Sequence, residues 1–133
     1  MASVTIVDES TGGGKHSWTL DVLDETLSAR ELIRRRVYQE VTEYNARQSG
    51  VFDGLVQPTG AERILNGERT GYRLSGGRRL DWEAQYEKAV EAFTRHGYIL
   101  LVEDRQVTEL DAPIELHAGS EVTFLRLVPL VGG

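Results

Sequence analysis

Residues 122–128, with the sequence VTFLRLV, constrain the fold of this chain more than any other segment. Over much of this length, apolar side chains fall on both faces of an extended strand. Such a run is typical of a central strand whose faces are covered, for example by a helix. We therefore expect a sheet whose most deeply held strand lies near the end of the chain.

The first part of the chain predicts a β-hairpin. Residues 3–7 and 16–22 are short β-rich runs, and the segment 10–15 between them is rich in glycine. In the second run apolar and polar residues alternate, as in a strand with one buried and one exposed face. We expect the two runs to pair as antiparallel strands around a glycine-rich tip.

A helix is predicted to begin at Ser28. Ser28 and Glu31 have the spacing of a capping box, and Leu27 can pack on Leu32 as a hydrophobic staple. Apolar residues then recur at helical spacing, and the helix is expected to end by residues 49–50.

Three consecutive arginines, Arg34, Arg35 and Arg36, lie within this predicted helix. Consecutive helical residues point about 100° apart, so the run does not form one basic patch. We expect these side chains on a solvated face, near the acidic residues Glu31, Glu40 and Glu43.

Residues 50–80 are rich in glycine and arginine and show no sustained hydrophobic period, so a long irregular segment is predicted. Its glycine-spaced arginines are also typical of a loop that binds nucleic acid or an acidic partner. A solvated loop is the favoured interpretation. The arginines concerned are Arg69, Arg73, Arg78 and Arg79.

A second helix is predicted to begin after Asp81, its expected N-terminal cap, and to close at His96-Gly97. Trp82, Tyr86 and Phe93 form an aromatic stripe along it. We expect this stripe to pack in the core rather than to bind a partner.

The last third of the chain predicts strands again, at residues 98–102, 106–107 and 121–128. A turn is expected at Glu103-Asp104. The connection before the last strand carries three apolar residues that we expect under the sheet: Leu110, Ile114 and Leu116.

The predicted order is β-β-α, an inserted loop and helix, then β-β-β, which is an α+β arrangement in the order of a β-grasp fold. In that fold the last strand lies parallel to the first in the centre of the sheet. A length of 133 residues with 40% hydrophobic content suits one compact domain. We expect this β-grasp domain over residues 1–129, with an insertion at about 50–97, followed by an extended tail over 130–133.

Composition excludes several classes of site. The chain has no cysteine, which excludes disulfides, thiolate zinc sites, iron–sulfur clusters and a cysteine nucleophile. A formal net charge of −6 disfavours nonspecific binding to nucleic acid. The acidic start and the lack of a run of ~20 apolar residues predict no export signal and no membrane span. We therefore expect a cytoplasmic protein with neither nucleic acid nor membrane as a partner.

The chain ends in the segment Pro129, Leu130, Val131, Gly132 and Gly133. Pro129 cannot donate a ladder hydrogen bond, so strand pairing should stop near it and the last four residues should project. Glycine has no Cβ, so a diglycine segment can enter a narrow channel and bring its carboxylate close to a nucleotide on another protein.

These features resemble the ubiquitin-like family. The resemblance lies in the strand-to-helix stretch at residues 19–33 and in the ending at residues 119–133. The ending is also similar to the small sulfur carriers of molybdopterin and thiamine biosynthesis. The inserted loop and helix at about 50–97 have no counterpart in the minimal family pattern.

The resemblance implies a carrier rather than an enzyme, with no catalytic residue, cofactor or metal site of its own. A partner adenylating enzyme of the ubiquitin-activating type would use ATP and magnesium to activate the Gly133 carboxylate. Gly132 would belong to the same conjugation and activation site as Gly133, and Leu130, Val131 and Pro129 would contact the partner. A conjugating enzyme, a deconjugating protease and target proteins are the further partners implied. Because Gly133 is the last residue, no trimming is expected before activation.

Three functions remain open at this point. A protein modifier would transfer the acyl group to a target amine, whereas a sulfur carrier would convert it to a thiocarboxylate. The inserted loop and helix favour the modifier, and the presence of only Lys15 and Lys88 would limit self-conjugation. A stand-alone interaction module is the third reading. His16, His96 and His117 are expected to be ordinary surface or capping residues rather than metal ligands or acid–base catalysts.

Overall fold

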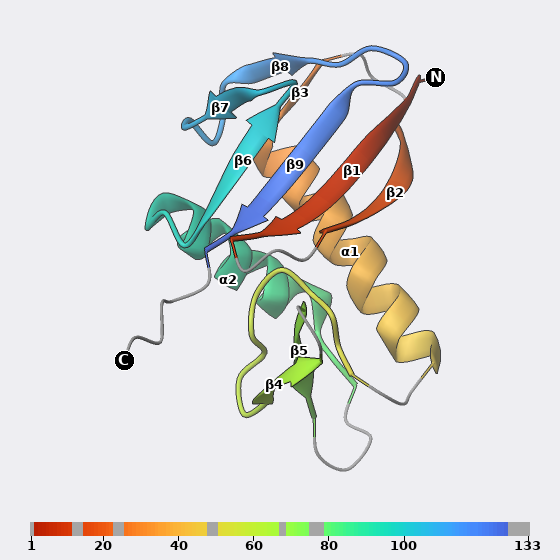
Figure 1. Ribbon diagram of the computed structural model, residues 1–133, viewed down its shortest axis with the longest axis vertical. Coiled ribbons are helices and arrows are strands. Elements are labelled where there is room, and N and C mark those ends of the chain that lie inside the picture. The colour runs from red at the N-terminus through yellow and green to blue at the C-terminus, as the bar shows by residue number, and fades with distance from the viewer. Residues whose placement is uncertain are drawn as a thin grey trace. The chain divides into compact units, whose positions relative to one another are not determined.

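The computed structural model describes residues 2–11, 15–22, 26–47, 51–66, 69–74 and 79–127. The fold is α+β, with helices and a sheet that contains both parallel and antiparallel pairs (Figure 1). The chain divides into two compact units. The first consists of Met1–Ala29 and Phe93–Gly133, and the second of Arg30–Ala92.

A five-stranded sheet forms the first unit. Its strand order is β2 (Lys15–Val22), β1 (Ala2–Ser10), β9 (Glu121–Arg126), β6 (Tyr98–Val102) and β7 (Arg105–Val107). Strands β1 and β9 are parallel, while the other neighbours are antiparallel. Figure 1 shows β9 between β1 and β6. The predictions of an N-terminal hairpin and of a central last strand parallel to the first are thereby confirmed.

A tight turn sets the start of β9 against β1. The Ser120 N–H donates to the His117 carbonyl oxygen at 2.9 Å, which closes the turn. The Gly119 N–H donates to the Ser3 carbonyl oxygen at 2.8 Å, and the Thr5 N–H donates to the Ser120 carbonyl oxygen at 2.8 Å. Gly119 has a φ of 84°, a conformation that glycine adopts without steric cost. These contacts fix the register in which Thr5 faces Glu121.

One face of this sheet is buried. Cross-strand partners share a face, and on this one Ile6 pairs with Val122 while Phe124 pairs with Leu100. Each of these four side chains is fully buried. A separate two-stranded pair joins β3 (Thr26–Ser28) to β8 (Pro113–Glu115).

The connection before β9 was expected to carry buried apolar residues. Ile114 and Leu116 are buried as predicted, and Leu110 is partly buried. The connection is not wholly irregular, because part of it forms β8, whose Ile114 faces Leu27 of β3.

The second unit contains most of α1 (Ala29–Arg47) and α2 (Trp82–Thr94), with the hairpin of β4 (Glu62–Asn66) and β5 (Arg69–Arg73). Helix α1 begins directly after Ser28, as predicted. The expected end of α1 at residues 49–50 lies outside the described residues.

Helix α2 begins where the sequence predicts it. The Asp81 carboxylate oxygen Oδ1 accepts a hydrogen bond from the Glu83 backbone N–H at 3.1 Å. This is the contact of an N-terminal cap, which satisfies a backbone donor that the helix itself cannot. At the other end His96, rather than Gly97, takes the left-handed conformation, with a φ of 61°.

The prediction of an irregular segment over residues 50–80 is wrong for β4 and β5, whereas residues 51–61 belong to no helix or named strand, as predicted. Strands β4 and β5 form an antiparallel ladder, and Phe52 bridges to Tyr72 through two backbone hydrogen bonds of 2.7 and 2.8 Å. Sequence periodicity misses this hairpin because Gly71 interrupts it. A Cβ at Gly71 would collide with the Val51 side chain, so glycine lets the two backbones approach.

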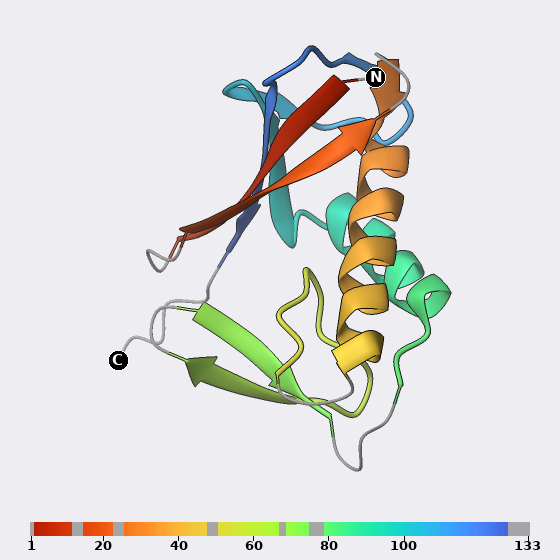
Figure 2. The ribbon, with the colours of Figure 1, turned by 90° about the vertical axis from the view of Figure 1, so that its right-hand side faces the viewer.

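Aromatic packing builds the core of the second unit. The buried Phe52 ring lies 5.4 Å from Tyr44 of α1 and 6.5 Å from Tyr72 of β5, measured between ring centroids. The Asn45 side chain donates to the Leu80 carbonyl oxygen and accepts from the Leu80 N–H, both at 2.9 Å. Figure 2 shows the loop before β4 beside the C-terminal half of α1.

The predicted solvated face for the arginine run is wrong for Arg36. Its side chain is 1% exposed, and its Nε donates to the Glu40 carboxylate at 3.2 Å. The other Glu40 oxygen accepts a hydrogen bond from the Leu55 N–H at 3.2 Å. A turn of about 100° per residue places Arg36 inward while Arg34 points to solvent. The expected pairing with Glu40 is found, but inside the protein.

Candidate functional site

All five residues of the predicted activation site, Pro129, Leu130, Val131, Gly132 and Gly133, lie outside the described residues. The described chain reaches Leu127, one residue beyond the end of β9. The base of this C-terminal segment is therefore defined by β9 and its two neighbours.

Strand β9 is anchored on both sides up to its last residue. Arg126 faces Ser10 of β1 on one side and Tyr98 of β6 on the other. The Thr11 N–H also donates to the Arg126 carbonyl oxygen at 3.0 Å. The next side chain, Leu127, is 42% exposed. The predicted strand over residues 121–128 is thus shorter in the structure, and its pairing stops at Arg126.

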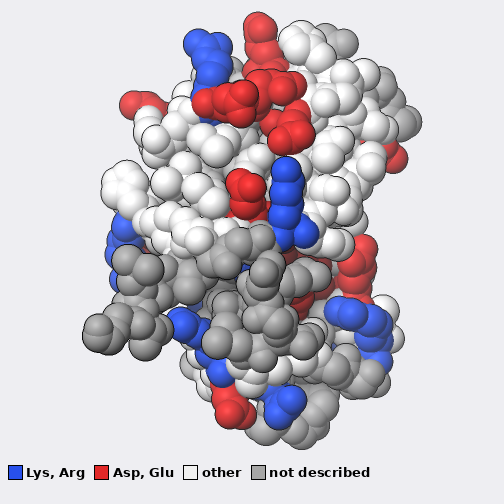
Figure 3. Space-filling model, viewed as in Figure 1, with Lys and Arg blue, Asp and Glu red and all other residues white. Residues whose placement is uncertain are grey.

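An apolar surface lies on the other face of the sheet from the buried one, and we call it the outer sheet face. Cross-strand pairing places Val7 beside Thr123, Thr123 beside Leu101, and Leu125 beside Ile99. Val7 and Thr123 are buried, whereas Leu101, Leu125 and Ile99 are partly exposed. Figure 3 shows uncharged side chains over much of the sheet with charged ones among them, and Glu9 pairs with Leu125 on this face. The described chain ends at Leu127, two residues after Leu125 of this surface.

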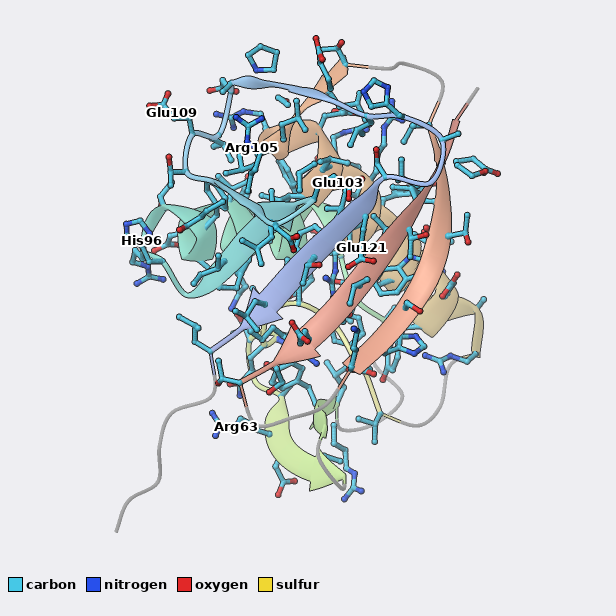
Figure 4. The ribbon with its side chains drawn as sticks, turned by 45° about the horizontal axis from the view of Figure 1, so that its top comes forward. Arg63, His96, Glu103, Arg105, Glu109 and Glu121 are labelled. Carbon is cyan, nitrogen blue, oxygen red and sulfur yellow. The ribbon has the colours of Figure 1, made fainter. Side chains whose placement is uncertain are left out.

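Acidic side chains gather at the opposite end of β9. The Glu103 N–H donates to the Glu121 carbonyl oxygen at 3.0 Å, and the Glu121 N–H donates to the Glu103 carboxylate at 3.3 Å. Figure 4 shows these two residues side by side, well away from His96. With φ angles of 53° and 79°, Glu103 and Asp104 form the tight turn between β6 and β7. The carboxylate of Glu103 thus has a structural partner, and the turn expected at Glu103-Asp104 is confirmed.

The three histidines lie on different elements. His16 is on β2, with its ring 5.7 Å from that of Trp18, and His96 ends α2. The His117 N–H donates to the Ser120 hydroxyl at 2.8 Å. In the part of the chain that the structure describes, no group of three or more His, Cys, Asp or Glu side chains is placed to hold a metal ion.

A second surface emerges on α1 and α2 that sequence reasoning assigned to the core. Phe93 is buried as predicted, but Trp82 and Tyr86 are only partly buried. The Trp82 ring meets Tyr38 edge to face at 5.3 Å, and the guanidinium of Arg34 lies 5.5 Å from the Trp82 ring centroid. Tyr38 is 51% exposed. The spacing of Arg34 and Tyr38, four residues apart on one helix face, was the available signal for this surface.

Comparison with protein-family models, with curated proteins and with solved structures finds no match to this chain. Among the described residues, no helix is both long enough and apolar enough to cross a membrane.

Proposed function

We propose that this chain is a ubiquitin-like protein modifier with a β-grasp fold, activated at the Gly133 carboxylate and joined to an amine of a target protein. The observation that carries the proposal is the strand order β2-β1-β9-β6-β7, with β9 central and parallel to β1. The glycines Gly132 and Gly133 are the sixth and seventh residues after the end of this central strand. A firmly held strand leading into a diglycine segment is the arrangement that a carboxyl-terminal carrier needs.

The anchoring of β9 supports this role physically. Pairing with strands on both sides holds β9 in the sheet up to Arg126, so β9 should stay paired when a partner protein binds the segment that follows it. Seven further residues reach at most about 25 Å when fully extended. That length allows Gly133 to enter an active site on another protein while the sheet stays outside. The outer sheet face, at the base of the segment, supplies an apolar contact for the activating enzyme.

The chemistry proceeds by replacement of one leaving group by another. A carboxylate is a poor acyl donor, so its oxygen first attacks the α-phosphate of ATP and displaces pyrophosphate. The resulting acyl adenylate loses AMP when a partner's cysteine thiolate attacks the Gly133 carbonyl carbon. A target lysine amine then displaces that thiolate, loses its proton and forms an isopeptide bond. ATP and magnesium belong to the partner enzyme in this scheme.

Mass spectrometry of the chain from its native host tests the proposal. The chain carries an N-terminal affinity tag and is purified under denaturing conditions, so that covalent partners alone remain attached. Trypsin cleaves after Arg126 and leaves residues 127–133 on any modified lysine. We expect target peptides with this seven-residue remnant. Deletion of Gly133 should abolish them, whereas the control Gln106→Ala, on the edge strand β7, should not change their yield.

A sulfur carrier is the second candidate, favoured by the similarity of the ending over residues 119–133 to sulfur carriers. In that case sulfur replaces one oxygen of the Gly133 carboxylate, and lysine remnants are absent. The mass of the intact chain distinguishes a thiocarboxylate at Gly133 from conjugation to a target protein. An unmodified carboxylate with the cognate activating enzyme present and active would contradict both, and would favour the stand-alone interaction module.

A further inference from the structure

Four side chains form a surface that spans α1 and α2 within the second unit, and we call it the Arg-aromatic surface. It consists of Arg34, Tyr38, Trp82 and Tyr86. Tyr38 meets Trp82 edge to face at 5.3 Å, and Trp82 lies 6.4 Å from Tyr86 between ring centroids. Both views show α1 and α2 side by side (Figures 1 and 2). Tyr38 is one of two large apolar side chains classed as exposed among the described residues.

The surface is held in place before any partner binds. The Glu31 carboxylate accepts from Arg34 Nη1 at 3.2 Å and from Arg35 Nε at 3.0 Å. The Arg34 guanidinium in turn lies against the Trp82 ring. Side chains that are already ordered lose little conformational entropy on binding. Trp, Tyr and Arg are also the residue types that dominate binding energy at protein interfaces.

The charge of the surface indicates the chemistry of its partner. Arg30, Arg34 and Tyr38 follow one another at intervals of four residues, are all exposed, and make a stripe about 12 Å long on α1. With Arg35 this side of α1 carries three arginines, and Arg34 and Arg35 share the Glu31 carboxylate, on a chain whose formal net charge is −6. Glu83 and Glu87 lie on α2, so the positive charge belongs to the α1 side.

We propose that the Arg-aromatic surface docks an acidic segment of a partner protein, with its carboxylates against Arg30 and Arg34 and an apolar side chain against Tyr38 and Trp82. A nucleic acid presents an unbroken row of phosphate charges to a chain whose formal net charge is −6, whereas a protein segment can place a few carboxylates against the arginines alone, so we assign the surface to a protein. This surface goes beyond the proposed activation at Gly133 and uses none of its residues. The proposal therefore stands independently of that function.

Selection from a phage-displayed library of random short peptides tests the proposal on the full-length chain. We expect peptides that combine aspartate or glutamate with an apolar residue to be enriched. Synthetic versions of the enriched peptides should lose about tenfold or more in affinity for Arg34→Glu and for Tyr38→Ala. The matched control Arg47→Glu reverses another exposed arginine about 20 Å along the same helix and should leave affinity unchanged.

Charge exchange makes the test specific. A peptide whose acidic residues are replaced by lysine should bind Arg34→Glu more tightly than the native chain, and binding of the acidic peptide should weaken as salt rises. Circular dichroism of each variant checks that the fold is kept. Enrichment of basic peptides would overturn the proposal. So would enriched peptides whose affinity falls as much in Arg47→Glu, or in Leu125→Glu on the outer sheet face, as in Arg34→Glu. Binding of a single-stranded oligonucleotide at physiological salt, if Tyr38→Ala abolishes it, would also overturn the proposal, in favour of a nucleic-acid site.

Discussion

Gly119 shows at the scale of one residue how the turn before β9 depends on its amino acid. Its φ of 84° suits glycine, and no heavy atom outside its chain neighbours lies within 4 Å of the position that a Cβ would take. Any penalty for a side chain at this position therefore comes from the local backbone conformation and not from a clash with the surrounding structure.

Gly119→Ala is expected to lower the free energy of unfolding by about 1–2 kcal/mol, since an L side chain pays this cost in the left-handed region. Gly119→Asn should lose less, because asparagine tolerates that region better. Urea denaturation monitored by circular dichroism measures both changes. Equal losses for alanine and asparagine would show that the backbone conformation is not the cause.

Arg36 and Glu40 form a buried ion pair, with side chains 1% and 11% exposed. Removal of one partner takes away the opposite charge that faces the other in a medium of low dielectric constant. Arg36→Met should therefore destabilise the chain by about 3 kcal/mol or more. Glu40→Gln keeps an acceptor for the Leu55 N–H, so the double variant Arg36→Met/Glu40→Gln should recover much of that loss. The comparison uses denaturant unfolding of the two single variants and the double variant, and a double variant no more stable than Arg36→Met would contradict it.

At the scale of an element, the residues at the two ends of α2 contribute in opposite directions to the stability of the fold. Asp81 caps the N-terminus through the Glu83 N–H, while His96 closes the C-terminal turn with a positive φ and its N–H bonded to the Phe93 carbonyl oxygen at 3.1 Å. The first residue suits its position, and the second holds a conformation that glycine would adopt more easily.

Asp81→Ala should cost about 1 kcal/mol of stability, while Asp81→Asn should cost little because the amide oxygen still accepts the hydrogen bond. His96→Gly should gain up to about 1 kcal/mol. The two sites are a helix length apart, so the effects should add in the double variant. Thermal unfolding of the three single variants and of Asp81→Ala/His96→Gly measures this, and a destabilised His96→Gly would indicate that the histidine side chain supports the turn.

At the scale of the whole molecule, the two proposed surfaces use different residues. The activation segment follows β9 in the first unit, and the Arg-aromatic surface lies on α1 and α2 in the second. Because the two surfaces share no residue, a variant should be able to lose conjugation without losing peptide binding, and the reverse.

We expect deletion of Gly133 to remove all conjugates while leaving binding of the acidic peptide unchanged. Arg34→Glu should show the reverse: weaker peptide binding with conjugate yield unchanged under an excess of activating enzyme. Peptide titration and quantification of the lysine remnants provide the two readouts. Loss of both properties in one variant, with its fold intact, would show that the surfaces act together.

Local signals in the sequence identified the elements that depend on local chemistry. The alternation in residues 16–22 predicted β2, and the cap at Asp81 predicted the start of α2, because strand faces and helix ends are set by neighbouring residues. The apolar run near the end predicted a central strand, and β9 is central. The diglycine segment stays a prediction, since it lies outside the described residues.

The tertiary structure alone decided the features that depend on residues far apart in the chain. The burial of Arg36 required Glu40 and the Leu55 backbone to meet it, and the β4–β5 hairpin required Phe52 to bridge to Tyr72. The Arg-aromatic surface likewise required Tyr38 of α1 to meet Trp82 of α2. Periodicity indicates whether a residue lies on the apolar or the polar face of its own helix or strand. Which side chain from another element packs against that residue is determined only by the tertiary fold.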